Sequence, residues 1–119
     1  MKSTHNLLKH AQRCHNEGRF LAAADFLLEA FRGEPEDPKI SCELGKVLRS
    51  VGDTEGAITY LKRAWQHDAT CPETVAQLIL ALHEERREDE AVQVMLNALN
   101  AGLDESEFTN CIVGRAEEA

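Results

Sequence analysis

The chain has 119 residues, a length typical of one domain with a hydrophobic core of its own. Its apolar fraction is 43% and its charged fraction 29%, which is ordinary for a globular chain, but aromatic residues make up only 5%. The net charge of −8, without a concentrated basic stripe, argues against a nucleic acid partner and against an acidic membrane surface. No apolar run is long enough for a transmembrane helix, so we expect no membrane insertion.

The N-terminal residues favour a cytoplasmic location, and this location in turn suggests the state of the cysteines. Residues 1–6, with the sequence MKSTHN, lack the apolar block of a signal peptide. The four cysteines form no CxxC motif, and no two of them are close in sequence. We therefore expect reduced thiols.

The first half of the chain predicts two pairs of helices. Apolar residues recur at three- and four-residue spacing over residues 4–17 and 20–32, with Thr4 as a candidate N-cap and Gly18 at the turn. A second pair is expected to begin at Pro38, a residue that suits the first helical turn. Gly52 and Asp53 form its turn, and Thr54 is expected to cap its second helix.

A third helix pair begins at Pro72 and is expected to end at Gly102. Its turn differs from the other two, because Arg86 stands where the first pairs have Gly18 and Gly52. If the turn geometry is kept, Arg86 takes a left-handed conformation at a cost of about 1 kcal/mol. The alternative is a reshaped turn.

Residues 106–119 predict a last helix with one apolar side, formed by Phe108, Cys111 and Ile112. Such a helix could cap a stacked array, or be the first half of a fourth repeat. Its apolar side also makes Phe108 and Ile112 candidates for self-association into a homo-oligomer.

The three helix pairs repeat one pattern with a period of 34 residues. Small and large apolar residues recur in columns: Ala23, Ala57 and Ala91; Ala30, Ala64 and Ala98; Leu27, Leu61 and Met95; Phe31, Trp65 and Leu99. A period of this length indicates a stack of helical hairpins. The Trp65 column is expected to pack against the following unit.

The pattern resembles the tetratricopeptide repeat, with its W-x₂-L-G-x₂-Y…A-x₃-F…P signature. Ser41-x₂-Leu44-Gly45-x₂-Leu48 followed by Ala57-x₃-Leu61 carries it most clearly. The resemblance implies an all-α, right-handed α-solenoid in a single domain, with units at 4–37, 38–71 and 72–105 and a capping helix at 106–119. It also implies a concave groove for an extended peptide or a partner helix, usually without catalysis.

Small residues in the first helices should set how closely the two helices of a unit approach each other. Ala11 and Gly45 allow close approach, whereas Ile79 occupies the same column in the third unit. We therefore expect a wider helix pair there.

A known groove of this family grips the terminal carboxylates of heat-shock chaperone tails with Lys, Asn and Arg. The matching positions here are Leu8, Gln12, Glu43, Glu73 and Gln77. They supply no cation, and two of them would repel the ligand, so the sequence argues against chaperone-tail binding of that type.

The groove face predicted from the register leans basic in its first two units and acidic in its third. Its candidate contact residues are Lys9, Gln12, His15, Lys39, Glu43, Lys46, Arg49, Glu73, Gln77 and Leu80. This pattern predicts an adaptor whose groove orients a protein or peptide partner, with an acidic segment near Lys46 and Arg49. An ordinary solvated helix face, a self-assembling scaffold module and a short secretion-type chaperone are the alternatives.

Catalytic and metal chemistry find little support in the sequence. His10 and Cys14 are four residues apart on one helix, with Cys42 and His15 as conceivable partners for zinc. However, His10 and Cys14 fall in columns that are apolar in the next unit. No nucleophile–base arrangement or phosphate loop appears, so we expect neither an enzyme nor a cofactor.

Overall fold

The computed structural model describes residues 4–109, which contain six full α-helices and no strand. The helices are α1 (Thr4–Asn16), α2 (Phe20–Gly33), α3 (Pro38–Ser50), α4 (Thr54–His67), α5 (Pro72–Glu84) and α6 (Glu88–Asn100). Residues 105–109 are again helical. None of the helices in this range is long and apolar enough to span a bilayer.

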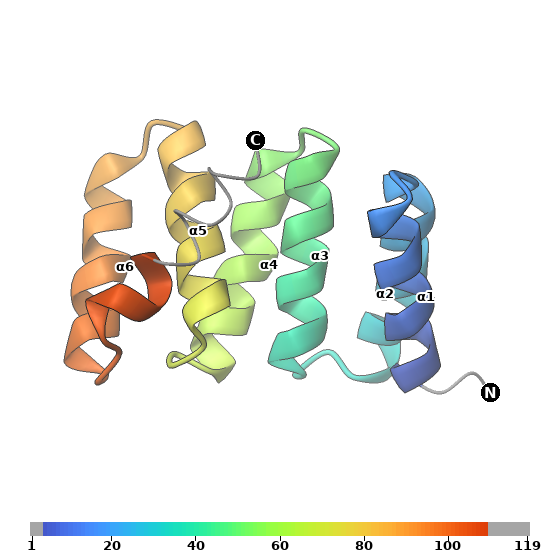
Figure 1. The fold of residues 1–119 in the computed structure, drawn as a ribbon, viewed down its shortest axis with the longest axis horizontal. Helices are drawn as coiled ribbons and strands as arrows, with labels where there is room; N and C mark the ends of the chain where they lie inside the picture. The colour runs from blue at the N-terminus through green and yellow to red at the C-terminus, as the bar shows by residue number, and fades with distance from the viewer. Residues whose placement is uncertain (1–3, 110–119) are drawn as a thin grey trace.

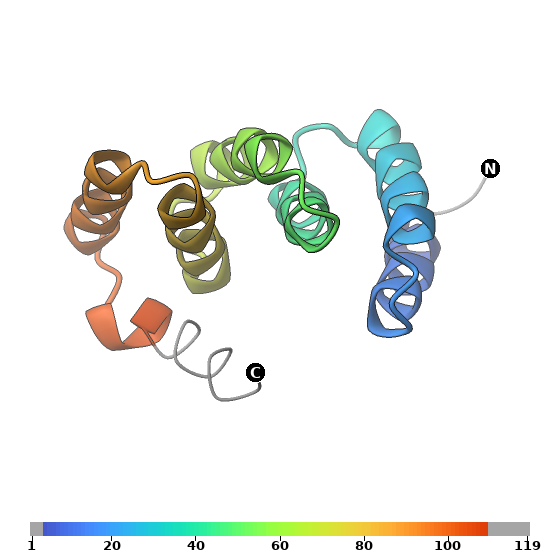
Figure 2. The same ribbon diagram turned by 90° about the horizontal axis from the view of Figure 1, so that it is seen from above.

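The helices form antiparallel pairs that stand side by side along the longest axis of the molecule (Figure 1). Seen from above, α1, α3 and α5 lie toward the inner side of a curved array, and α2, α4 and α6 lie toward its outer side (Figure 2). Each helix packs mainly on the one before and the one after it. The arrangement is the expected all-α solenoid, in which every layer contacts only its neighbours. The exact boundaries between the repeat units stay a prediction.

The helix starts follow local chemistry, with one correction. Pro38 and Pro72 are the first helical residues of α3 and α5, as predicted. The predicted cap Thr54 is wrong: Asp53 is the N-cap of α4, and its carboxylate accepts a hydrogen bond from the Gly56 amide at 3.0 Å. An ionised side chain one residue earlier satisfies a free amide and also faces the positive end of the helix dipole.

The turns within the three pairs share one backbone conformation. Gly18 and Gly52 have φ angles of 78° and 90°, and Arg86 has a φ angle of 58°. In each turn the amide of the following residue donates to a carbonyl five residues earlier, as from Arg87 to Leu82 at 2.8 Å. The third turn therefore keeps the geometry of the others, and Arg86 adopts the strained left-handed conformation that it requires.

The alanine columns lie at the centre of the array. Ala23, Ala57, Ala64 and Ala98 are fully buried. Phe31 and Trp65 pack against the following pair, as predicted, whereas Leu99 in the same column is 39% exposed. Phe31 makes an edge-to-face contact with Tyr60, with ring centroids 5.4 Å apart, and Trp65 packs on the core cluster that α4 shares with α5 and α6.

The closeness of the two helices in each pair follows the size of one residue. The backbones of α3 and α4 are in the most extensive contact, those of α1 and α2 in less, and those of α5 and α6 in least. The residues at the crossing are Gly45, Ala11 and Ile79 respectively. A Cβ atom on Gly45 would lie 2.8 Å from Cδ2 of the fully buried Leu61. The less extensive contact between α5 and α6 agrees with the expectation of a wider pair at Ile79.

Phe108 is a core residue, which corrects its proposed role in self-association. Its side chain is only 1% exposed and belongs to the cluster formed with α5 and α6. It falls in the same repeat column as Ile40 and Thr74, which are equally buried. A side chain that the chain itself covers has no surface to offer a second copy. Ile112, the other candidate, lies outside the described residues.

Replacing Gly45 with Ala should destabilise the fold by about 1–3 kcal/mol, because the new methyl group overpacks the contact with Leu61. Urea unfolding followed by circular dichroism measures the change. Gly33→Ala is the matched control, since a Cβ atom there meets nothing within 4 Å. Equal effects of the two substitutions would contradict the close approach of α3 and α4.

Replacing Arg86 with Gly should stabilise the fold by about 1 kcal/mol, because glycine adopts a positive φ without steric cost. Thermal and urea unfolding would measure the gain. Arg86→Ala removes the same side chain but keeps the Cβ atom, so it should give little of this gain. A gain from alanine as large as that from glycine would assign the effect to the charge of Arg86 instead.

Candidate functional site

Two adjoining pockets lie along the inner helices, near the N-terminal ends of α3 and α5. The first has a volume of about 150 Å³ and lies between α1 and α3. The second, of about 210 Å³, lies between α3 and α5. Lys39 and Glu43 line both pockets, so the two pockets adjoin each other along the three inner helices, and together they are called the depression below.

The first pocket is the basic end of this depression. His5, Lys9 and Lys39 line it together with Leu8 and Gln12. Within residues 4–109, the ammonium groups of Lys9 and Lys39 make no hydrogen bond or ion pair. Two of the predicted groove cations are thus brought together and left available to a ligand.

Lys46 is held by carboxylates of two neighbouring helices. Its Nζ lies 2.6 Å from Glu73 Oε1 on α5 and 3.4 Å from Glu43 Oε1 on its own helix. Burial by itself would lower the pKa of Lys46, but the hydrogen bond that its ammonium group donates to Glu73 and the charges of Glu43 and Glu73 raise this pKa above its ordinary value. Lys46 therefore stays charged, and its charge is already compensated.

Arg49 is committed in the same way, one turn further along α3. Its Nη1 donates to Gln77 Oε1 at 2.6 Å, and its Nε donates to Glu84 Oε1 at 3.1 Å. Its second terminal nitrogen also pairs with Glu84. The Arg49 side chain is only 11% exposed, and Gln77 is 5% exposed. Both residues serve the contact between α3 and α5 more than an open groove.

These pairs change the predicted electrostatics of the groove. The sequence places a basic surface around Lys46 and Arg49 and an acidic surface in the third unit. In the structure the two surfaces neutralise each other, because their side chains meet across the α3–α5 contact. An acidic ligand segment would find its free partners at Lys9 and Lys39 instead. The residue spacing carried a usable signal, since Arg49 and Glu84 are one repeat plus one residue apart.

The remaining candidates for groove contact and for metal binding lie partly in the core and partly at contacts between helices. His15 Nε2 lies 3.2 Å from Ser50 Oγ and connects α1 to α3. Leu80 is partly exposed on α5. His10 stacks on Phe26 with ring centroids 5.4 Å apart, and Cys14 is buried in the core. In the range 4–109 no three His, Cys, Asp or Glu side chains converge to hold a metal ion.

Cys42 lines the second pocket but is an inert thiol. Its burial, together with the charges of Glu73 and Glu43, raises the pKa of Cys42 to about 12, against a weaker opposing effect of a Thr74 hydrogen bond. A thiolate is the reactive form of cysteine, so Cys42 contributes a small apolar surface rather than a nucleophile. Cys71 lines the same pocket, and neither cysteine is in a disulfide.

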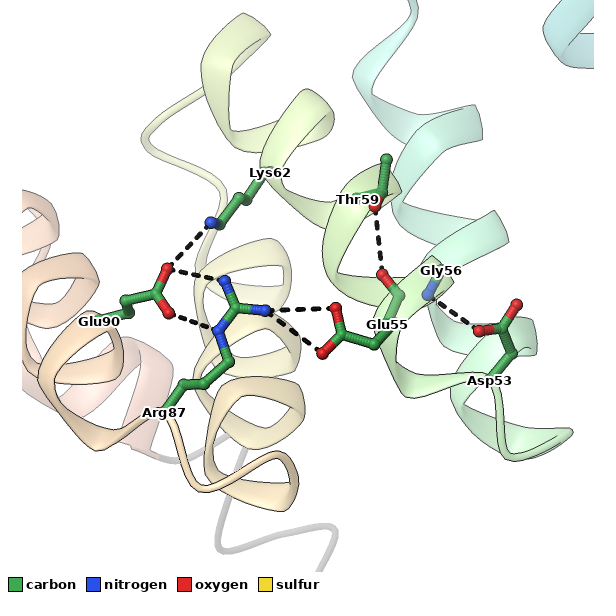
Figure 3. A network of polar contacts seen from close by, with 7 residues as sticks. All are labelled: Asp53, Glu55, Gly56, Thr59, Lys62, Arg87 and Glu90. Atoms are coloured by element: carbon green, nitrogen blue, oxygen red, sulfur yellow. Dashed lines mark hydrogen bonds and ion pairs between the residues drawn. The ribbon is translucent and has the colours of Figure 1, made fainter.

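A second network joins the outer helices α4 and α6 (Figure 3). Arg87 Nη2 donates to Glu90 Oε1 at 2.8 Å, and Lys62 Nζ lies 3.1 Å from the same oxygen. The other terminal nitrogen of Arg87 lies 3.4 Å from Glu55 Oε2. The hydrogen bonds and charges of Arg87 and Lys62 lower the pKa of Glu90 to about 2. Ion pairs thus connect the second helix pair to the third twice: between the inner helices α3 and α5, and between the outer helices α4 and α6.

The stability contributed by Glu90 should depend on pH in a defined window. A carboxylate with a lowered pKa in the folded state stabilises the protein above its ordinary pKa of 4.5. This contribution is lost as the pH falls from there to about 2. The stability difference between the wild-type protein and Glu90→Gln should therefore shrink over this window, as urea unfolding at stepped pH would measure.

The matched control is Glu29→Gln, because Glu29 is exposed on α2 and forms no ion pair with any residue in the range 4–109. Its stability difference should stay flat over the same pH range. A flat difference for Glu90→Gln as well would mean that the Arg87–Glu90–Lys62 pairs do not persist in solution.

Comparison with known proteins identifies the family to which this architecture belongs. The profile of the tetratricopeptide repeat family matches residues 48–110, more than half of the chain. A search of curated protein sequences finds no match. Among solved structures, the first tetratricopeptide domain of Spaghetti (RPAP3) bound to the HSP90 peptide SRMEEVD is similar, with a TM-score of 0.78 and 14% identity over 98% of this chain and 96% of that one.

Two further structures give the same result. The OM64 tetratricopeptide domain of Arabidopsis has a TM-score of 0.78 and 14% identity, over 92% of this chain and 90% of that one. The Sgt2 domain of Aspergillus fumigatus has a TM-score of 0.77 and 15% identity, over 99% of this chain and 80% of that one. At such identities these likenesses establish the fold alone. With its 34-residue columns, paired helices and profile match, the chain belongs to the tetratricopeptide repeat family.

Proposed function

We propose that this protein is an interaction adaptor, and that the depression across α1, α3 and α5 binds an extended segment or a helix of another protein. The observation that carries the proposal is the pair of adjoining pockets of about 150 and 210 Å³ that share Lys39 and Glu43. Family membership supports a binding module without catalysis, and the Spaghetti domain bound to a peptide is an example with this fold.

The groove is preformed, which favours binding. Lys46 and Arg49 connect α3 to α5, and His15 connects α1 to α3. A ligand that enters a rigid site loses less free energy to ordering of the receptor than one that enters a flexible site. These residues therefore act as positioning residues beneath the ligand.

The segment that fits the depression has an acidic part and a small apolar part. The free ammonium groups of Lys9 and Lys39 suit a carboxylate in the first pocket. The second pocket is largely apolar, with Pro38 and Cys42 in its wall. Its carboxylates already have partners: Glu43 and Glu73 pair with Lys46, and Asp68 accepts hydrogen bonds from Thr70. This arrangement orients the segment with its acidic part toward α1.

The groove does not resemble a clamp for the C-terminal tails of heat-shock chaperones. Glu43 and Glu73, at two of the clamp positions, surround Lys46, and Gln77 is bonded to Arg49. The peptide SRMEEVD, which the Spaghetti domain binds, should therefore bind this protein only weakly through Lys9 and Lys39. Fluorescence anisotropy with the labelled peptide tests this point directly.

Reversing Lys9 and Lys39 to Glu should weaken binding of an acidic partner segment by at least about tenfold, because two free charges are inverted at the groove. Segments for the measurement come from a peptide display selection on the wild-type protein, and anisotropy gives their affinities. The matched control reverses Arg13 and Arg32, exposed cations outside both pockets, with the same change in net charge.

Selected segments that bind both double variants equally would place binding outside the depression. Reversal of Lys46 and Arg49 is unsuitable for this test, because it would set new carboxylates against Glu73 and Glu84 and destabilise the fold.

A further inference from the structure

One face of α6 carries an apolar stripe that no described residue covers. Val92 and Leu96 are 53% and 50% exposed, and Leu99 is 39% exposed. Their spacing of four and then three residues puts them on one side of the helix. They are three of the five large apolar side chains that are exposed within residues 4–109. Single exposed apolar residues are common, but a contiguous stripe marks an interaction surface.

The corresponding residues of the earlier repeats indicate what kind of element would cover such a stripe. In α4 the residue that corresponds to Val92 is Ile58, which is only 3% exposed and belongs to the core cluster that α4 shares with α5 and α6. In α2 the residue that corresponds to Leu99 is Phe31, which packs against the next helix pair. The following pair thus covers the Val92 column at α4 and the Leu99 column at α2, whereas the Leu96 column holds Lys62 in α4, whose side chain is 39% exposed. A helix lying along α6 is the geometric complement of the open stripe.

The charges around the stripe indicate what that helix carries. Residues 91–103 contain no ionisable side chain, in a chain that is 29% charged. Acidic residues stand at both ends: Glu88 and Asp89 in the first turn of α6, and Asp104, Glu105 and Glu107 just beyond its end. The arginines near the first end only partly offset this charge, because Arg87 is paired with Glu90 and Glu55.

We propose that the α6 stripe docks a basic amphipathic helix of another protein, with apolar residues over Val92, Leu96 and Leu99 and Lys or Arg at both ends. This surface is separate from the groove of α1, α3 and α5. A second copy of the chain fits less well. In the antiparallel pairing of two α6 helices, the acidic first turn of one meets the acidic end of the other, and like charges repel.

The probe is a synthetic helical peptide of about 20 residues, with leucines at i, i+4 and i+7 on one face and lysines at both ends. It should bind the 119-residue chain, as titration calorimetry measures. Binding should weaken as salt is raised, because the terminal charges are screened. Leu96→Gln should reduce the affinity by about tenfold, since one leucine contact is lost. Asp89→Lys should reduce it as well.

Leu21→Gln is the matched control, because Leu21 is 76% exposed on α2, away from the stripe. A peptide with the same composition and scrambled leucines, and one with glutamates in place of the lysines, should bind at least about tenfold more weakly. The proposal is overturned if the probe does not bind, if Leu21→Gln weakens it as much as Leu96→Gln, or if the acidic peptide binds equally well. It is also overturned if ultracentrifugation finds a dimer of the wild-type protein that Leu96→Gln dissociates.

Discussion

The close approach of the two helices within each pair is the contact on which the rest of the array depends. At the crossing of α3 and α4 only a hydrogen atom separates the Gly45 backbone from the buried side chain of Leu61. Where Ile79 takes this place, α5 and α6 contact each other less closely. Because a solenoid has only contacts between neighbours, the separation inside one pair sets where the next pair lies. The position of the inner helices, and so the shape of the groove, follows from one column of residues.

Charge pairing between neighbouring inner helices is the second factor that determines how the helix pairs are arranged. Lys46 and Arg49 on α3 reach carboxylates on α5, and they hold the two helices in register. The same pairing uses up cations that the groove would otherwise offer to a ligand. It leaves Lys9 and Lys39 as the free positive charges of the depression. Stability of the inner face and the recognition that we propose for it would therefore draw on the same kind of side chain, and Lys46 and Arg49 serve stability.

Much of the fold was predictable because its signals are local or periodic. Pro38 and Pro72 mark helix starts through a missing amide, and Arg86 reveals a left-handed turn by standing in a glycine position. The wider third pair follows from Ile79 by comparison between columns. The error at Thr54 arose where Asp53 and Thr54 compete for one capping position, and the stronger acceptor precedes the helix. Local chemistry was sufficient at each of these positions once the register was known.

The sequence by itself determined the repeat, the helices, the turns and the residues that share a face, because these depend on spacing along one helix or on a fixed period. Only the tertiary structure decided which charges meet, that Phe108 is buried and that Val92, Leu96 and Leu99 are open. Those outcomes depend on the rotation and the distance between successive helix pairs. A shift of a few ångströms between two pairs would change which side chains meet and which are exposed. A long side chain such as Arg49 reaches either a ligand or Glu84 from the same position on α3, and the neighbouring helix decides between them.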